Sequence, residues 1–267
     1  MSTTHPDFVT VHHGSAPLVL SLPHTGTQLP EALLPSLVSP ALALKDTDWR
    51  IDLLYAFARE LGASLVHTAV SRTAIDVNRD PSGVSLYPGQ ATTGLVPLET
   101  FDGEPLYRPG AEPDAAGLAE RRKAWFEPYH AALAAEIARV RAEHPRIVVY
   151  DCHSIRSLVP RLFEGELPVF NIGSNGGTSC DEGLTATVRQ ACERSGESLV
   201  VDGRFRGGWI TRHYGERAKG VHAIQMELAQ RFYMDEDRPE VANAAKAGRA
   251  AAILRTVLEN ALAWVRG

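Results

Sequence analysis

Two histidines stand where apolar, strand-like segments of the chain end. His24 follows the segment APLVLSLP at 16–23, and His153 closes the run RIVVYDCH at 146–153, with several acidic residues near other such segments. Neutral imidazole and carboxylate groups suit zinc, and a catalytic zinc site uses three protein ligands and leaves a fourth position open. The pattern therefore predicts a divalent metal site that includes the two histidines.

An acidic residue in the last strand-like segment offers a base. Glu227 lies in HAIQMEL at 222–228, and a carboxylate beside an activated water can accept its proton. In DCHS, the alternation of a strand places Asp151 and His153 on one face and Cys152 on the other. Asp151 is therefore expected to orient the imidazole, while Cys152 is a poor candidate for a cysteine–histidine pair.

Positive charge gathers after the same segments, although the chain as a whole is acidic. The planar guanidinium group binds carboxylates and phosphates in a bidentate fashion, so the pattern predicts a receptor for an anionic ligand. The residues concerned are Arg72, Arg79, Arg204, Arg206 and Arg212.

Each of these residues also has a plainer structural interpretation. A single histidine at a strand end is more often solvated than ligating, and clustered arginines more often form surface ion pairs of small energy. Glu227 can be a structural ion-pair partner, and Asp48 can cap a helix that begins there. The joint placement of the residues, rather than any one of them, favours a functional site.

Strands that alternate with helices are expected to position these residues. Near-continuous apolar strands indicate a largely parallel sheet covered on both faces, whose ligands bind beyond the carboxyl ends of the strands. We predict an α/β fold in a single domain over residues 1–267. A stretch rich in Pro and Gly at 81–113 is too long for an ordinary connection and is expected to be a functional loop. The predicted strands are 16–24, 64–70, 146–154, 167–174, 198–205 and 220–228, and the predicted helices are 48–61, 115–143 with an interruption near Pro128, 181–195 and 239–264.

Composition narrows the class of protein. The 267 residues are 44% hydrophobic and carry a formal charge of −5, which gives no footprint for nucleic acid or an anionic membrane. The stretch MSTTHPDFVT lacks the regions of a signal peptide, and no apolar run approaches a membrane span. Three cysteines without a CxxC pair argue against a disulfide framework. These features favour a cytoplasmic enzyme or binding protein with a small-molecule partner.

Five motifs together resemble the N-formylglutamate amidohydrolase (N-formylglutamate deformylase) family. They occur in order from about residue 17 to residue 230, and are LSLPHTG, DTDW, SRTAIDVNRD, YDCHS and MEL. The resemblance implies a zinc-peptidase-like fold of three α/β/α layers around a largely parallel (mixed) sheet. It also implies zinc-dependent hydrolysis of N-formyl-L-glutamate to formate and L-glutamate in histidine degradation.

The resemblance also implies roles for individual residues. His24 and His153 match the two metal-binding histidines of the wider zinc carboxypeptidase group. That group usually has a glutamate three residues after the first histidine, but Thr27 stands here. The acidic ligand is then expected from DTDW, where we favour Asp48 over Asp46.

The remaining roles concern the substrate. Glu227 corresponds to the catalytic glutamate, and Arg72 to the arginine that polarises the scissile carbonyl. Substrate contacts are expected from Asn78 and Arg79 to one carboxylate and from Arg212 to the second, with Thr25 and Gly26 giving backbone contacts beside the metal.

Three alternatives stay open at this point. The first is a metal-dependent amidohydrolase of another acidic N-acyl amino acid, because one methyl group changes specificity only modestly. The second is a non-catalytic dicarboxylate-binding protein with structural histidines. The third is a cysteine hydrolase that uses Cys152. The sequence makes no prediction of the oligomeric state.

Overall fold

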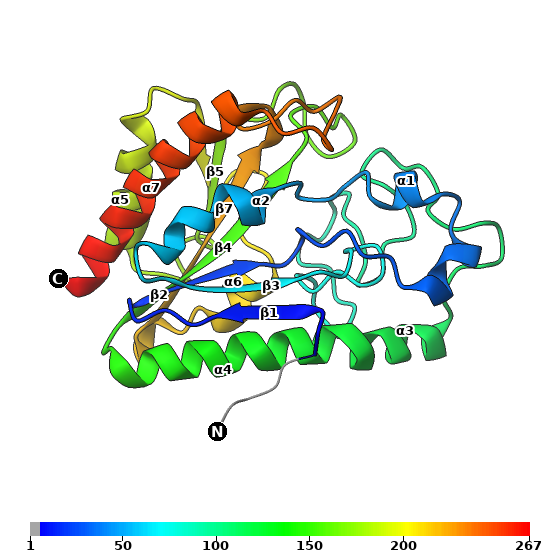
Figure 1. Ribbon diagram of the computed structural model, residues 1–267, viewed down its shortest axis with the longest axis horizontal. Coiled ribbons are helices and arrows are strands. Elements are labelled where there is room, and N and C mark those ends of the chain that lie inside the picture. Colours follow the sequence, from blue (N-terminus) through cyan, green and yellow to red (C-terminus); the bar gives the residue numbers. More distant parts are fainter. Residues whose placement is uncertain (1–5) are drawn as a thin grey trace.

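A seven-stranded mixed sheet runs through the molecule, with helices on both of its faces (Figure 1). The computed structural model describes residues 6–267. The first five residues of MSTTHPDFVT, the stretch in which we expect no signal peptide, lie outside the described residues. The strand order is β1-β3-β2-β4-β7-β5-β6. The strands are β1 Val9–His12, β2 Leu18–Leu22, β3 Ser64–Thr68, β4 Ile147–Ile155, β5 Phe170–Gly173, β6 Leu199–Val201 and β7 Val221–Ala229.

The four central strands, β3, β2, β4 and β7, are parallel to one another. β1 runs antiparallel to β3 and β5 runs antiparallel to β7, so the sheet is mixed. Every residue of β2, β4 and β7 is buried, as expected for parallel strands that are covered on both faces. All six predicted strands are present, and the short edge strand β1 is an addition.

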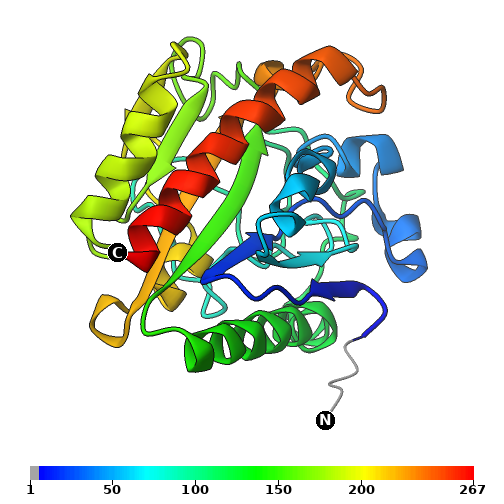
Figure 2. The ribbon, with the colours of Figure 1, turned by 60° about the vertical axis from the view of Figure 1, so that its left-hand side comes forward.

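Alternate residues of the strands feed two separate cores. Val149 packs in the core beneath α4, whereas its neighbour Tyr150 packs in the core beneath α7. Figure 2 shows α7 lying across one face of the sheet and α4 against the other. The three-layer α/β/α arrangement is therefore confirmed. One layer holds α3 Ala115–Arg121, α4 Glu127–Glu143 and α6 Trp209–Tyr214, and the other holds α2 Ile51–Leu54, α5 Glu182–Glu193 and α7 Ala244–Arg266.

Two predicted helices differ in detail from the structure. The segment 48–61 is not one helix, because it divides into α2 and the 3-10 helix η2 Ala56–Arg59 before Gly62 ends it at φ 75°. The segment 115–143 stays helical but contains a π-helical turn, η3 Arg122–Phe126, directly before Pro128. Proline has no N–H to donate to the carbonyl four residues earlier, and the chain widens there into a bond from Glu127 N–H to the Arg122 carbonyl.

The stretch between β3 and α3 contains no helix and no named strand, in agreement with the predicted loop 81–113. Among residues 6–267, no helix combines the length and the apolar character that a membrane span requires. The remaining short helices are η1 Glu31–Ser36, α1 Pro40–Ala43, η4 Arg217–Lys219 and η5 Gln230–Phe232.

Candidate active site

Three buried side chains converge at the carboxyl ends of β2 and β4. Asp48 Oδ2 lies 3.2 Å from His153 Nδ1 and 3.8 Å from His24 Nδ1. One ligand atom from each of the three residues lies within 4.8 Å of the others. β2 and β4 are neighbours in the sheet. The strand that follows β2 in the chain, β3, lies on one side of this pair, and the later strands β5, β6 and β7 lie on the other. Open α/β sheets bind ligands at a reversal of strand order of this kind.

Local structure explains why these residues meet. His24 stands directly after β2, where Pro23 ends the strand, and its carbonyl accepts a hydrogen bond from Asp48 N–H. Asp48 Oδ2 in turn accepts from Ser154 N–H, which ties it to β4. The sequence pattern predicts His153 at the very end of its strand. β4 instead continues to Ile155, so His153 lies within the strand.

Each imidazole is held from behind by a carboxylate. His24 Nε2 lies 2.7 Å from Asp76 Oδ1, and His153 Nε2 lies 3.1 Å from Asp151 Oδ2. Carboxylates in this position fix the tautomer and the ring orientation of metal-binding histidines. Because the Nε2 atoms are engaged, both rings turn their Nδ1 atoms toward Asp48.

Two buried polar atoms of this group lack hydrogen-bond partners in the described part of the chain and are suited to bind a metal ion. His24 Nδ1 and Asp48 Oδ1 are buried and have no hydrogen-bond partner among the described residues. An unsatisfied buried polar group costs about 1–3 kcal/mol, and a cation bound between the two would satisfy both. Two imidazoles and one carboxylate are a donor set of catalytic zinc sites.

The two histidines differ in the direction in which their surroundings shift the pKa. Burial, followed by the charge of Arg72, lowers the pKa of His24, so this imidazole is neutral, as a ligand must be. Burial alone would lower the pKa of His153, but Asp151 and Asp48 raise it well above its ordinary value. A metal that binds at Nδ1 of His153 must therefore displace a proton.

Neither Asp46 nor Thr27 joins this group. Asp46 Oδ2 accepts from Phe101 N–H at 2.7 Å, and its Oδ1 lies 3.2 Å from a guanidinium nitrogen of Arg156. Thr27 is exposed. Of the two acids in DTDW, the structure brings Asp48 to the histidines.

Cys152 points away from the site, as the alternation of β4 predicts. Its side chain is fully buried in the core beneath α7, and burial raises the pKa of the thiol well above its usual value. A thiol without access to substrate or to His153 cannot act as a nucleophile. The structure therefore argues against the cysteine hydrolase.

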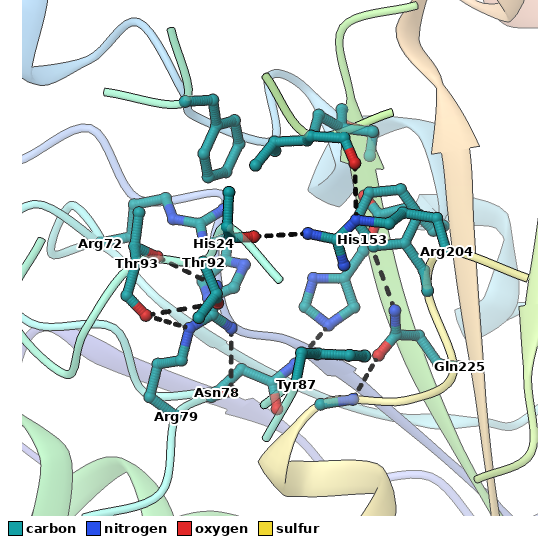
Figure 3. A pocket seen from close by; sticks show the side chains of 18 of the residues that line it. His24, Arg72, Asn78, Arg79, Tyr87, Thr92, Thr93, His153, Arg204 and Gln225 are labelled. Carbon is teal, nitrogen blue, oxygen red and sulfur yellow. Dashed lines mark hydrogen bonds between the residues drawn. The ribbon is translucent and has the colours of Figure 1, made fainter. Parts of the chain in front are cut away.

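A pocket opens beside His24 and His153, and together with its open mouth it contains about 640 Å³ of empty space (Figure 3). Glu227, Arg72, Asn78 and Arg79 line it together with His24 and His153. The lining comes from β4, from β7, and from the irregular segment between β3 and α3. These elements meet because the four parallel strands end at the same edge.

Glu227 stands beside His153, because the two residues are partners in the pairing of β7 with β4. Burial raises the pKa of its carboxyl to about 8. The only hydrogen-bond partner of this carboxyl group among the described residues is Gln225 Nε2, at 3.3 Å from Oε2. A carboxyl group that faces a pocket with few partners and a raised pKa is typical of a general acid–base residue.

Arg72 and Arg79 are held on the segment that follows β3. Arg72 Nη2 donates to Asp76 Oδ2 at 2.6 Å, and its Nη1 lies 3.6 Å from Asp48 Oδ1. Arg79 donates to the carbonyl and the hydroxyl of Thr93 at 3.1 and 3.0 Å. Both guanidinium groups therefore face the pocket in fixed positions.

Asn78 is engaged inside the protein. Its side-chain N–H groups lie 2.8 Å from His153 Nε2 and donate to Asp151 Oδ2 at 3.1 Å, and its Oδ1 accepts from Ile210 N–H at 2.7 Å. In this arrangement Asn78 positions His153. Its expected contact with a substrate carboxylate stays a prediction.

Three expected substrate residues lie outside the pocket. Arg212, on α6, donates to the Gly207 carbonyl and stacks on the Tyr87 ring. Gly26 packs against the backbone after β3, where an added Cβ would lie 2.3 Å from the Val70 carbonyl oxygen. Thr25 stands beside it and does not line the pocket either. The turn after His24 bends toward β3, and this explains why neither residue faces the site.

Several residues of the site were not singled out from the sequence. Two of them could have been predicted. Asp76 lies in the same DVNR motif as Asn78, and Gln225 lies two residues before Glu227, on the same face of β7. Five more residues lie in irregular segments with no pattern that could have indicated them. They are Tyr87, Thr92, Thr93, Phe101 and Arg161.

Comparison with known proteins shows the family of the chain. Residues 16–234 match the model of the family described as N-formylglutamate amidohydrolase. The chain is 48% identical to an N-formylglutamate deformylase of Pseudomonas aeruginosa and 45% identical to one of Pseudomonas putida, with 95% of each chain covered in both cases. The fold superposes on the crystal structure of an N-formylglutamate amidohydrolase from Ralstonia eutropha with a TM-score of 0.80 at 22% identity, covering 97% of this chain and 98% of the other. A gene product of Agrobacterium tumefaciens gives a TM-score of 0.75 at 18% identity, with 98% and 97% covered. By the extent and the level of these matches, the chain belongs to the N-formylglutamate amidohydrolase family.

Proposed function

We propose that this protein hydrolyses N-formyl-L-glutamate to formate and L-glutamate with the help of a zinc ion held by His24, Asp48 and His153. The observation that carries the proposal is the pair of buried, unpartnered atoms, His24 Nδ1 and Asp48 Oδ1, beside Glu227 in a pocket lined by arginines. The names of the two Pseudomonas relatives support the choice of substrate. A place in histidine degradation and in the cytoplasm remains a prediction.

The residues of the pocket divide the chemistry among them. When bound, zinc supplies Lewis acidity, which polarises a carbonyl and makes water a better nucleophile. Glu227 takes the proton from the attacking water on its carboxylate and returns it to the departing amine of glutamate. Burial raises the pKa of this carboxyl and so favours its protonated form, whereas a cation bound nearby would favour the carboxylate that the first step needs.

Positive charge in the pocket serves the transition state and the substrate. The Arg72 guanidinium, fixed by Asp76, faces the pocket and stabilises the oxyanion that develops as the carbonyl is attacked. Removal of one such donor typically slows a reaction by about 10²–10³. Arg79 is fixed by Thr93 and is suited to one carboxylate of the substrate.

The test is formate release from N-formyl-L-glutamate by the purified protein, before and after treatment with a chelator, and again after zinc is added back. Activity that is lost with the chelator and returns with zinc is the expected result. Hydrolysis of N-acetyl-L-glutamate is measured in parallel. Faster hydrolysis of this compound would indicate that the enzyme acts on another acidic N-acyl amino acid. No hydrolysis of N-formyl-L-glutamate by zinc-loaded protein would refute the proposal.

Glu227→Gln serves as the matched variant in the same assay. It keeps the size of the side chain but cannot accept the proton, so hydrolysis is expected to fall by at least about 10², the usual contribution of a general base, with zinc content unchanged. A variant with full activity would show that Glu227 is not the base.

A further inference from the structure

Arg204 differs from the other arginines of the pocket in having no acidic partner. Arg72 pairs with Asp76, and Arg161 pairs with Glu99. Within residues 6–267, no carboxylate lies within 4 Å of the Arg204 guanidinium, although it lines the pocket that Glu227 also lines.

The surroundings of Arg204 are carbonyl groups and aromatic rings. Its Nε donates to the Leu162 carbonyl at 2.8 Å and its Nη2 to the Ala91 carbonyl at 2.6 Å, while Nη1 has no partner among the described residues. The guanidinium carbon lies 5.4 Å from the ring centres of both Tyr87 and Phe205. Burial lowers the pKa of Arg204, and repulsion from Arg79 adds to this, so the cation is less stable here than in water. An anion bound in the pocket would offset that cost.

Arg204 is held by different partners from those of the arginines beside the proposed zinc ligands. Arg79 approaches Asp76, with 3.5 Å between Nη2 and Oδ2, and Asp76 bonds His24, so Arg79 belongs to the immediate surroundings of the proposed zinc ligands. Arg204 instead contacts the surrounding loops. In Figure 3, Arg204 enters the pocket from the side of Gln225, and Arg72 and Arg79 enter it from the opposite side.

The substrate has two carboxylates at different distances from the scissile bond. In an N-acyl glutamate, the α-carboxylate is attached to the carbon that bears the amide nitrogen, and the side-chain carboxylate is two methylene groups further away. The near carboxylate suits Arg79, and the far one suits a cation on the surrounding loops.

We propose that Arg204 binds the side-chain carboxylate of the substrate and thereby sets the preference of the site for acidic N-acyl amino acids. The inference rests on the proposed function and adds the residue that selects the charged side chain. It replaces Arg212, which lies outside the pocket, where its side chain donates to the Gly207 carbonyl and lies over the Tyr87 ring.

The test compares N-formyl-L-glutamate with N-formyl-L-glutamine, which has nearly the same shape and no side-chain charge. For Arg204→Gln, kcat/KM for N-formyl-L-glutamate is expected to fall by about 10- to 100-fold, the range for a lost hydrogen bond to a charged group. The value for N-formyl-L-glutamine is expected to change by less than about threefold, within the scatter of single-site effects. The preference for the charged substrate is therefore lost while the reaction itself remains.

Two further variants bound the interpretation. Arg206→Gln removes an exposed arginine two residues away, outside this pocket, and is expected to leave the preference unchanged. Arg212→Gln tests the competing assignment, and loss of the preference in that variant instead would overturn the proposal. An equal fall in kcat/KM for both substrates in Arg204→Gln would also overturn the proposal. That result would indicate that Arg204 binds the α-carboxylate or has a structural role.

If Arg204→Gln does not fold, Arg204→Lys decides, because it keeps the charge but not the planar fork. In this variant, kcat/KM is expected to fall about 10-fold for N-formyl-L-glutamate and not for N-formyl-L-glutamine. An unchanged ratio of the two kcat/KM values would refute the proposal. Failure of the proposed function is distinguishable, because the wild-type protein would then release no formate from either substrate.

Discussion

Two acids only two residues apart in the chain have different surroundings. Asp48 is bound to the site from two sides, by its own N–H to the His24 carbonyl and by Oδ2 from the Ser154 N–H. Its Oδ1 has no hydrogen-bond partner within residues 6–267. Asp46 is engaged by Arg156 and the Phe101 backbone, away from the histidines. The free oxygen of Asp48 makes it the acidic ligand that we expect.

Asp48→Ala is therefore expected to lose its zinc, and Asp46→Ala is expected to keep it. Loss of a ligand should weaken zinc binding by more than the 10–100-fold typical of changes in the residues behind the ligands. Metal analysis after dialysis, together with competition against a chelator, measures this. Circular dichroism of both variants checks that each is folded. Zinc retained by Asp48→Ala but lost from Asp46→Ala would refute the assignment.

At the level of single residues, the apolar pattern of the strands indicated where part of the site lies. His24, His153 and Glu227 were found because each lies at or near the carboxyl end of a buried strand, where the apolar pattern marks it. Arg212 does not line the pocket, because its segment folds into α6 and turns its side chain toward Gly207, so its expected contact with the substrate stays a prediction. A spacing along an irregular segment does not give the direction of a side chain.

At the level of elements, the turn after β2 depends on one close approach of two backbones. Gly26 lies against the segment after β3, and Gln28 N–H bonds the Ala69 carbonyl at 2.8 Å. A side chain at position 26 has no room, because its Cβ would lie 2.3 Å from the Val70 carbonyl oxygen. This turn also holds His24, two residues before Gly26, so its shape fixes a proposed zinc ligand.

Gly26→Ala is expected to lower the free energy of unfolding by about 2–3 kcal/mol, the upper part of the range for overpacking. Gly248→Ala is the matched control. Gly248 is exposed on α7 with nothing near its added Cβ, so alanine is expected to raise the free energy by about 0.5–1 kcal/mol. Urea unfolding of both variants gives the two values. A stable Gly26→Ala protein would show that the turn can relax.

The elements themselves were predictable to different degrees. The parallel strands were found because their burial on both faces requires continuous apolar runs, and α5 and α7 because they are long. The helix expected at 48–61 was wrong as a single element, because the chain turns at Tyr55 to pack Ile51 and Ala58 on the sheet. Tertiary packing overrides a helical spacing when the segment is this short.

At the level of the whole molecule, one histidine joins three separate parts of the chain. His130, on α4, donates from Nε2 to the Val77 carbonyl at 2.8 Å, and its Nδ1 lies 2.9 Å from the Tyr214 hydroxyl of α6. Val77 belongs to the motif that also carries Asp76 and Asn78. The helical layer is thereby tied to the segment that holds the site. Burial lowers the pKa of His130 to about 4.

This pKa predicts a loss of stability in mild acid. The unfolded chain takes up the proton near pH 6.5 and the folded protein only near pH 4, so protons favour unfolding between these values. The contribution of neutral His130 is complete above pH 6.5 and declines as the pH falls toward 4. Between pH 7 and pH 5 it amounts to about 2 kcal/mol, at about 1.4 kcal/mol for each pH unit of difference. His130→Gln cannot titrate, so its urea midpoint is expected to fall less than that of the wild type over the same range, by a difference that corresponds to this energy. Parallel curves for the two proteins would mean that His130 takes up its proton equally well in the folded and unfolded states, and that the link between α4 and the site does not depend on pH.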